Sequence, residues 1–172
     1  MENPKLNFFS KNLPKLSDGR IDYTKSKVAI VVNIVVMFKD EVLILKRSSN
    51  VSTNKNVWDC VGGYYDEDVP PENIAMKELE EELGITKKNV ENLIQLETFE
   101  IVSDKNWIIY PFIAKLNKKI EIKLDWEHTE YKWIKENEAR GKILKILNSY
   151  SNTIKKSNSS EKTHQCKAFP SC

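Results

Sequence analysis

The sequence has few cysteines and almost no net charge. Its 172 residues include three cysteines, Cys60, Cys166 and Cys172. Their odd number and their spacing favour neither a disulfide framework nor a zinc site. The 27 Lys and Arg residues nearly balance the 25 Asp and Glu residues. The chain as a whole therefore has no strong electrostatic attraction to nucleic acid or to a membrane surface.

Long apolar runs are also missing. The longest spans residues 28–38 and is interrupted by Asn33, whereas a membrane-spanning helix needs about 20 apolar residues. The first residues, Met1 to Pro4, lack the basic-then-apolar order of a secretion signal. The C-terminal lysines have no interleaved aromatic residues that would indicate RNA binding. We therefore expect a soluble, cytoplasmic protein without a membrane or nucleic-acid partner.

The apolar patterning predicts one domain of the α/β class, with a mixed β-sheet sandwiched between α-helices. Residues 1–26 are expected to form an N-terminal arm, residues 27–148 the domain, and residues 149–172, which are rich in Ser, Asn and Lys, a disordered C-terminal tail. The strands are predicted over 27–38, 42–46, 58–61, 93–102, 107–116 and 131–134, and the helices over 71–83 and 135–148.

The predicted helix over 71–83 concentrates negative charge on one face. Glu78, Glu81 and Glu82 lie within an arc of about 100°, beside the apolar arc that faces the core. They occupy the last turns, where the helix dipole disfavours each carboxylate by roughly 0.3–1 kcal/mol. A solvated acidic face is one interpretation, but such crowding also indicates a compensating cation. Carboxylates suit Mg²⁺ or Mn²⁺, and Mg²⁺ commonly shares its ligands with substrate phosphates.

Residues Gly63 to Ile85 resemble the Nudix box, which runs Gly, five residues, Glu, seven residues, Arg-Glu-apolar-any-Glu-Glu-any-Gly-apolar. The spacing matches without insertion or deletion. The resemblance implies the Nudix fold and a divalent metal, Mg²⁺ or Mn²⁺, bound by Glu78, Glu81 and Glu82 and by the carbonyl oxygen of Gly62. In that mechanism the metal neutralises phosphate charge and lowers the pKa of bound water.

Two positions depart from the family pattern. Val69 stands where the family has glutamate, and Lys77 stands where it has arginine. In the family these two side chains form a supporting pair that orients the catalytic carboxylate. Both members change here, so no buried charge is stranded, but lysine lacks the planar fork of arginine. Glu67 or Asp68 could give Lys77 a replacement partner, and reduced or narrowed activity is a hypothesis.

A second resemblance covers residues 127–133. It is similar to the Glu-His-any-any-Tyr-any-Trp segment of several Nudix hydrolases, including diadenosine tetraphosphate hydrolases. The resemblance implies that Glu127 reaches the metal site from a loop, as a base or an extra ligand. We expect His128 to fix the Glu127 loop by a hydrogen bond, with phosphate contact as the alternative. We expect Tyr131 and Trp133 to pack in the core.

Further candidates for substrate binding flank this centre. Lys46 and Arg47 end a predicted strand and could bind phosphates, although charged strand ends are often only solvated. Gly63 borders the same centre. Trp107 and Tyr110 alternate on a strand and could stack on a base or pack in the core.

We predict a hydrolase that cleaves a phosphoanhydride bond of a nucleoside diphosphate linked to another moiety, such as a nucleoside triphosphate or a dinucleoside polyphosphate. The alternative is a non-catalytic module for nucleotide sensing or protein interaction, because the supporting pair is missing. Isomerisation of an isopentenyl-like diphosphate is a weaker option, since no catalytic cysteine and glutamate context is recognisable. The sequence names neither the exact substrate nor the base. Oligomeric state is open, although many Nudix domains form homodimers.

Overall fold

The structure is a computed structural model that describes residues 8–9 and 11–165, with side chains through Ile154. Its strands form one eight-stranded sheet built around β1 in the order β3-β2-β1-β7-β5, with β4 paired to β1, β6 to β7 and β8 to β2. β1 and β7 run parallel and the other pairs are antiparallel. The strands are β1 (Val28–Phe38), β2 (Glu41–Arg47), β3 (Trp58–Asp59), β4 (Val61–Tyr64), β5 (Val90–Gln95), β6 (Phe99–Val102), β7 (Asn106–Leu116) and β8 (His128–Lys135).

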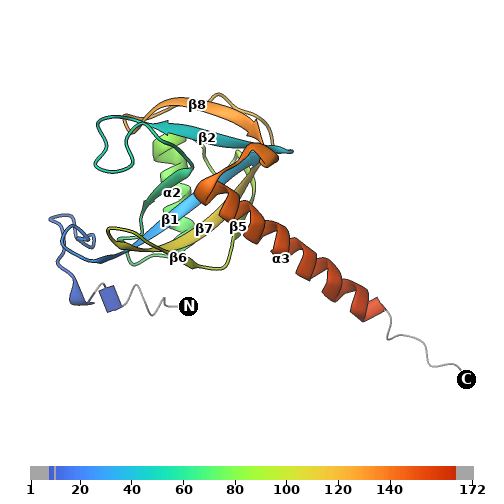
Figure 1. The fold of residues 1–172 in the computed structure, drawn as a ribbon, viewed down its shortest axis with the longest axis horizontal. Coiled ribbons are helices and arrows are strands. Elements are labelled where there is room, and N and C mark those ends of the chain that lie inside the picture. The colour runs from blue at the N-terminus through green and yellow to red at the C-terminus, as the bar shows by residue number, and fades with distance from the viewer. Residues whose placement is uncertain (1–7, 10, 166–172) are drawn as a thin grey trace, which may run out of the picture.

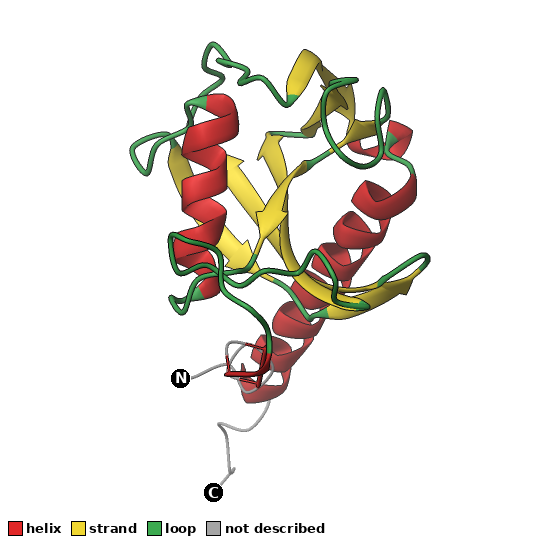
Figure 2. Cartoon of the chain, turned by 90° about the vertical axis from the view of Figure 1, so that its left-hand side faces the viewer, coloured by secondary structure: helices red, strands yellow, loops and turns green. Residues whose placement is uncertain are grey.

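Two helices, α2 (Pro71–Leu83) and α3 (Gly141–Gln165), lie on opposite sides of this sheet (Figures 1 and 2). β1 is apolar along most of its length because both of its faces are covered. Ile30, Val32 and Ile34 point into the core beneath α2, whereas Val35 and Met37 point into the core beneath α3. The predicted α/β class and the sheet sandwiched between helices are confirmed.

Several predicted elements differ from the structure. The strand predicted over 58–61 divides into β3 and β4, and the strand predicted over 93–102 divides into β5 and β6. The strand predicted over 131–134 is longer, because β8 begins at His128. The helix predicted over 135–148 begins only at Gly141, after a 3₁₀ turn at Glu136–Glu138, and its backbone continues to Gln165. The backbone of this helix covers residues 149–165 of the predicted C-terminal tail, and residues 166–172 lie outside the described part. Tyr150 is buried against the sheet, and lengthening a helix that is already nucleated costs little.

The described part of the N-terminal arm packs onto the domain. Ile21 and Tyr23 are buried in the core cluster beneath α2. The Tyr23 hydroxyl donates a hydrogen bond of 2.9 Å to the carbonyl oxygen of Tyr65, and the Ile21 amide donates one of 2.9 Å to the carbonyl oxygen of Asp66. In the described part of the chain, no helix is long and apolar enough to cross a membrane.

Candidate active site

Helix α2 begins and ends where local chemistry predicts. Pro71 occupies the first helical turn, where its missing N–H breaks no helical hydrogen bond. Gly84 closes the helix in the left-handed conformation (φ 67°), which is costly for residues with a side chain. Leu79 and Leu83 are fully buried against the sheet, whereas Glu80 is exposed. This rotation of the helix brings Glu78 and Glu82 against the glycines of β4. Glu81 is exposed and lines the neighbouring cavity.

Glu82 carries a buried carboxylate with an unsatisfied oxygen. Glu82 as a whole is only 3% exposed to solvent. Oε1 accepts a 3.4 Å hydrogen bond from the amide of Gly62, and Oε2 has no hydrogen-bond partner among the described residues. The His128 ring nitrogen Nδ1 lies 3.7 Å from Oε2. Burial and the neighbouring charge of Glu78 raise the pKa of Glu82 well above its ordinary value.

Glu78 lies directly against the backbone of Gly63. A Cβ atom added at Gly63 would be 2.1 Å from Oε1 of Glu78, so only glycine permits this approach. Burial, followed by the negative charge of Glu81, raises the pKa of Glu78 to about 7. The first glycine of the motif thus has a steric explanation, because it admits a carboxylate from the helix.

A loop before β8 brings Glu127 to the same region. Oδ1 of Asp125 accepts a 3.0 Å hydrogen bond from the Glu127 amide and lies 3.4 Å from Nδ1 of His128. The amide of Ser48 donates a 2.7 Å hydrogen bond to the Glu127 carbonyl oxygen. Burial raises the pKa of Glu127, with a further contribution from Asp125, and burial lowers the pKa of His128. His128 lies buried beside the loop, where we predicted a structural role for it.

The two departures from the family motif have separate local explanations. Lys77 forms an ion pair with Glu67, one of the two replacement partners predicted from the sequence. Val69 packs against the core cluster beneath α2, and its carbonyl oxygen accepts a 2.7 Å hydrogen bond from the Tyr65 hydroxyl. An apolar contact and a shifted ion pair therefore replace the supporting pair of the family.

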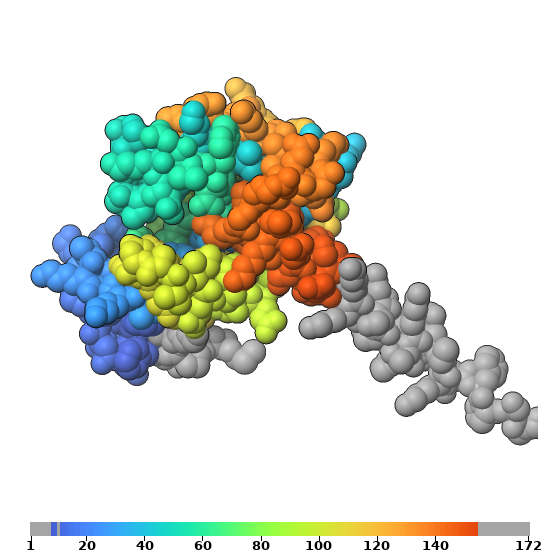
Figure 3. Space-filling view, in the orientation of Figure 1, coloured from blue at the N-terminus to red at the C-terminus, as the bar shows by residue number. Residues whose placement is uncertain are grey.

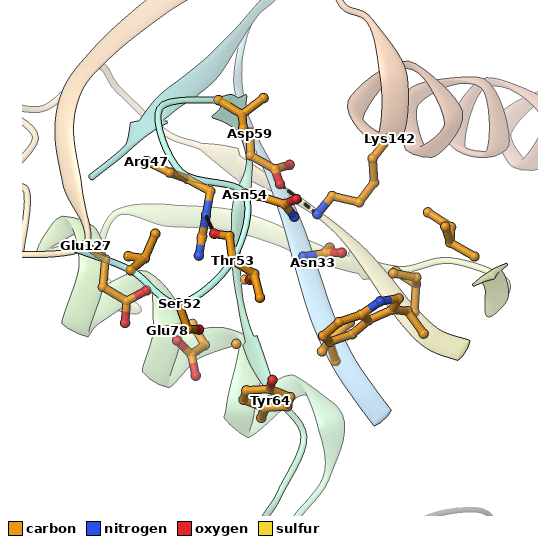
Figure 4. Close-up of a pocket in the computed structure, with 18 of the residues that line it drawn as sticks. Asn33, Arg47, Ser52, Thr53, Asn54, Asp59, Tyr64, Glu78, Glu127 and Lys142 are labelled. Carbon is orange, nitrogen blue, oxygen red and sulfur yellow. Dashed lines mark hydrogen bonds and ion pairs between the residues drawn. The ribbon is translucent and has the colours of Figure 1, made fainter. Parts of the chain in front are cut away.

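A cavity of about 760 Å³ adjoins the carboxylates. The loop of residues 51–57 and the β6–β7 hairpin border it, and the hollow between them is visible in Figure 3. Arg47, Glu78 and Glu127 lie on one side of the cavity, and Asn33 and Lys142 lie on the other (Figure 4). A volume of this order accommodates a small-molecule ligand.

The structure brings only some of the predicted substrate-binding residues to this cavity. Arg47, Gly63 and Trp107 line it. Lys46 instead pairs with Glu130 at 2.6 Å, because consecutive strand residues point to opposite faces. Tyr110 is buried in the core, with its ring centroid 5.5 Å from that of Tyr65, and does not line the cavity.

The lining residues that were absent from the sequence-based predictions include Arg20, Asn33, Asp59 and Lys142. Asn33 had a recognisable signal, a polar residue inside an apolar strand. Arg20 belongs to the N-terminal arm, where its guanidinium pairs with Asp18 at 2.8 Å. Lys142 donates a 2.9 Å hydrogen bond to Asp59. The positions of these three charged residues depend on long-range packing.

The donor set has the chemistry of a site for a hard divalent cation. Carboxylates of Glu78, Glu81 and Glu82 and the carbonyl oxygen of Gly62 are oxygen ligands of the type that Mg²⁺ and Mn²⁺ prefer. The unpartnered oxygen of Glu82 is consistent with such a ligand. Among the described residues, no group of three or more His, Cys, Asp or Glu side chains is already arranged as a metal site.

Comparison with known proteins identifies the family. The family model described as the NUDIX domain matches residues 27–156, so the chain belongs to this family. A curated relative, putative 8-oxo-dGTP diphosphatase 3 of Mycobacterium tuberculosis, is 26% identical over 99 residues, which cover 56% of this chain and 46% of the relative. The chain thus spans about half the length of the curated relatives it matches.

Solved structures share the fold. An Ap4A hydrolase of C. elegans in a binary complex has a TM-score of 0.60 and 23% identity, over 73% of this chain and 97% of that one. The MutT protein of Methanosarcina mazei Go1 has a TM-score of 0.53 and 30% identity, over 64% of this chain and 79% of that one.

Proposed function

We propose that this protein is a Mg²⁺- or Mn²⁺-dependent pyrophosphohydrolase that cleaves a phosphoanhydride bond in a nucleoside diphosphate linked to another moiety. One observation carries the proposal. Glutamates from two separate segments, Glu78, Glu81 and Glu82 of α2 and Glu127 of the loop before β8, lie at or beside one cavity of about 760 Å³. The helix dipole disfavours carboxylates at the C-terminal end of α2, so their crowding there favours a bound cation.

Glu78, Glu81, Glu82 and the carbonyl oxygen of Gly62 would hold the divalent cation. When bound, such a cation neutralises phosphate charge and lowers the pKa of coordinated water. Burial and the neighbouring carboxylates raise the pKa values of Glu78 and Glu82, which supports a site where a cation compensates their charge. A bound cation would supply the missing compensation.

Arg47 and Glu127 have complementary roles in this proposal. The Arg47 side chain lines the cavity and donates from Nε to the carbonyl oxygen of Thr53 at 3.3 Å, which leaves its terminal nitrogens for substrate phosphates. Glu127 is positioned by Asp125 and would accept a proton from the attacking water or serve as an additional ligand.

The names of the relatives support this substrate class. 8-Oxo-dGTP and Ap4A, which appear in the names of the M. tuberculosis and C. elegans proteins, are both nucleotides with phosphoanhydride bonds. The second candidate function is nucleotide binding without turnover. It is favoured by the replacement of the family's supporting pair by the Lys77–Glu67 ion pair and the apolar packing of Val69.

A substrate panel tests both candidates. Nucleoside triphosphates, dinucleoside polyphosphates, NADH, ADP-ribose, nucleotide sugars and capped RNA are incubated with Mg²⁺ or Mn²⁺, and products are identified by mass spectrometry. Glu81→Gln should lower turnover by about 100-fold or more. The matched control is Glu80→Gln, an exposed neighbour outside the cavity lining, which should keep wild-type turnover. Nucleotide binding without any metal-dependent product would replace the hydrolase with the sensing module.

A further inference from the structure

The apolar strand β1 is interrupted by one buried polar residue, Asn33, which is 5% exposed. Its Oδ1 atom makes no hydrogen bond with any residue that the structure describes. Leaving a buried polar atom unpaired costs about 1–3 kcal/mol, and buried side-chain amides in native proteins are usually paired. An apolar residue would fill this strand position without that cost. The buried amide therefore indicates a hydrogen-bonding ligand from outside the chain.

The packing of β1 against β4 fixes where the amide lies. Asn33 is opposite Gly62 in the antiparallel register, and a Cβ atom added at Gly62 would lie 2.1 Å from Nδ2 of Asn33. A Cβ atom added at the next residue, Gly63, would likewise clash with the carboxylate of Glu78. Successive strand residues face opposite sides of a sheet, so the backbone of β4 separates Asn33 from the helix carboxylates.

The start of α3 leaves this part of the sheet open. Asn33 and Val31 share a face of β1 with Val35, which lies in the core beneath α3. Both Asn33 and Val31 line the cavity instead, together with Lys142 from the first turn of α3. Asn33 therefore occupies the cavity floor, on the side opposite Arg47 and Glu78 (Figure 4).

The walls around Asn33 suit a flat, largely apolar group. Ile109 and Ile143 line the cavity, and Trp107 and Tyr64 add an aromatic wall with their ring centroids 6.2 Å apart. Ligand sites typically combine such apolar walls with a few polar groups that fix orientation.

One charged pair in the lining, Asp59 and Lys142, is internally satisfied. Oδ1 of Asp59 accepts a hydrogen bond from the Cys60 amide at 2.8 Å, and Oδ2 accepts one from Lys142 at 2.9 Å. Both carboxylate oxygens of Asp59 are thus already engaged. Asn33 is the lining residue whose buried oxygen still lacks a partner within the described chain.

We infer that Asn33 binds the hydrogen-bonding edge of a purine base and is a specificity-determining residue. The inference rests on the proposed function, which makes the ligand a nucleotide. The amide presents one donor and one acceptor side by side, and this pattern complements adjacent acceptor and donor atoms on a base edge, as in the pairing of Asn with adenine. A purine is chosen over a pyrimidine because its larger ring buries more apolar surface against the cavity walls. The phosphates then extend toward Arg47 and the glutamates.

Calorimetric binding to the Glu81→Gln protein tests the inference without turnover. The probes are ATP, GTP and purine riboside triphosphate, which lacks the exocyclic group and so forfeits one hydrogen bond. We expect the better of ATP and GTP to bind about tenfold more tightly than purine riboside triphosphate. Adding Asn33→Leu should reduce that ratio to about one, because the better of ATP and GTP loses two hydrogen bonds and purine riboside triphosphate loses only the one that it retains.

Two further variants make the result interpretable. Asn33→Ala removes both the donor and the acceptor with a smaller side chain, so it should also lose the preference and provides the test if the leucine variant does not fold. Asn50→Leu makes the same chemical change at an exposed position outside the cavity lining and should keep the wild-type ratio. Equal affinities for all three nucleotides before substitution would overturn the inference. So would an unchanged ratio in the Asn33 variants, or an equal loss of affinity for all three.

Failure of this inference is distinguishable from failure of the proposed function. Base-selective binding that depends on Asn33, without product from the wild-type protein, would refute hydrolysis and leave the base site intact. Metal-dependent products with no effect of Asn33 on nucleotide preference would leave the hydrolase intact and refute the base site.

Discussion

Replacing Glu82 by glutamine should stabilise the metal-free protein while it lowers turnover. Burial and the charge of Glu78 raise the pKa of Glu82, so the folded state keeps this proton to a higher pH than the unfolded chain does. The folded state then binds more protons than the unfolded state as the pH rises above 4.5, the ordinary value. The free energy of unfolding therefore falls through this window until the folded-state carboxyl is ionised. A neutral glutamine removes this loss.

The size of the effect follows from the buried charge, which glutamine removes while it keeps the shape of the side chain. A buried group without a compensating partner costs about 1–3 kcal/mol, and more when it is charged. For a chain of this length, each kcal/mol shifts the midpoint of thermal unfolding by roughly 2–4 °C. Metal-free Glu82→Gln should therefore unfold roughly 2–12 °C above the wild-type protein at pH 8. The difference should shrink toward pH 5, where the wild-type carboxyl is protonated in the folded state.

Thermal unfolding followed by circular dichroism in EDTA at several pH values measures this difference. Glu80→Gln, on the exposed face of the same helix, should show no such pH-dependent gain. Mg²⁺ or Mn²⁺ should raise the unfolding midpoint of the wild-type protein more than that of Glu82→Gln. If Glu82→Gln gains nothing at pH 8, or if Glu80→Gln gains as much, then Glu82 is not an uncompensated charge and the reasoning about the cation is wrong.

Two other substitutions test the geometry of the site. Gly63→Ala should lower turnover by at least tenfold, because its methyl group would take the place of the Glu78 carboxylate. The midpoint of thermal unfolding should change little, since the flexible end of the Glu78 side chain can move aside. Arg47→Ala should raise KM by about 10–100-fold, because a charged hydrogen bond to phosphate is lost. The control Lys46→Ala should leave KM unchanged, because Lys46 pairs with Glu130 away from the cavity. Steady-state kinetics on the substrate found in the panel measures both, and equal effects at positions 46 and 47 would contradict the assignment.

The sequence by itself determined the local elements and the acidic centre. Helix α2 has the predicted bounds because Pro71 and Gly84 act through their own backbone chemistry. β1 was predictable because a strand covered on both faces is apolar throughout. The spacing from Gly63 to Gly84 predicted the family, which the match over residues 27–156 confirms. The sequence predicted Glu67 or Asp68 as the ion-pair partner of Lys77, and in the structure Lys77 pairs with Glu67.

Only the tertiary structure decided which side chains reach the cavity. A strand pattern alone does not distinguish Lys46 from Arg47, or Trp107 from Tyr110, as substrate-binding residues. The packing of the rest of the chain determines that Arg47 and Trp107 line the cavity. The cavity floor at Asn33 exists because α3 begins at Gly141 and leaves that part of β1 uncovered. The sequence also placed the end of the last helix too early, because the average polarity of the residues after 148 does not reveal the buried contact of Tyr150. These features arise from contacts between segments far apart in the sequence, for which no local pattern of residues carries a signal.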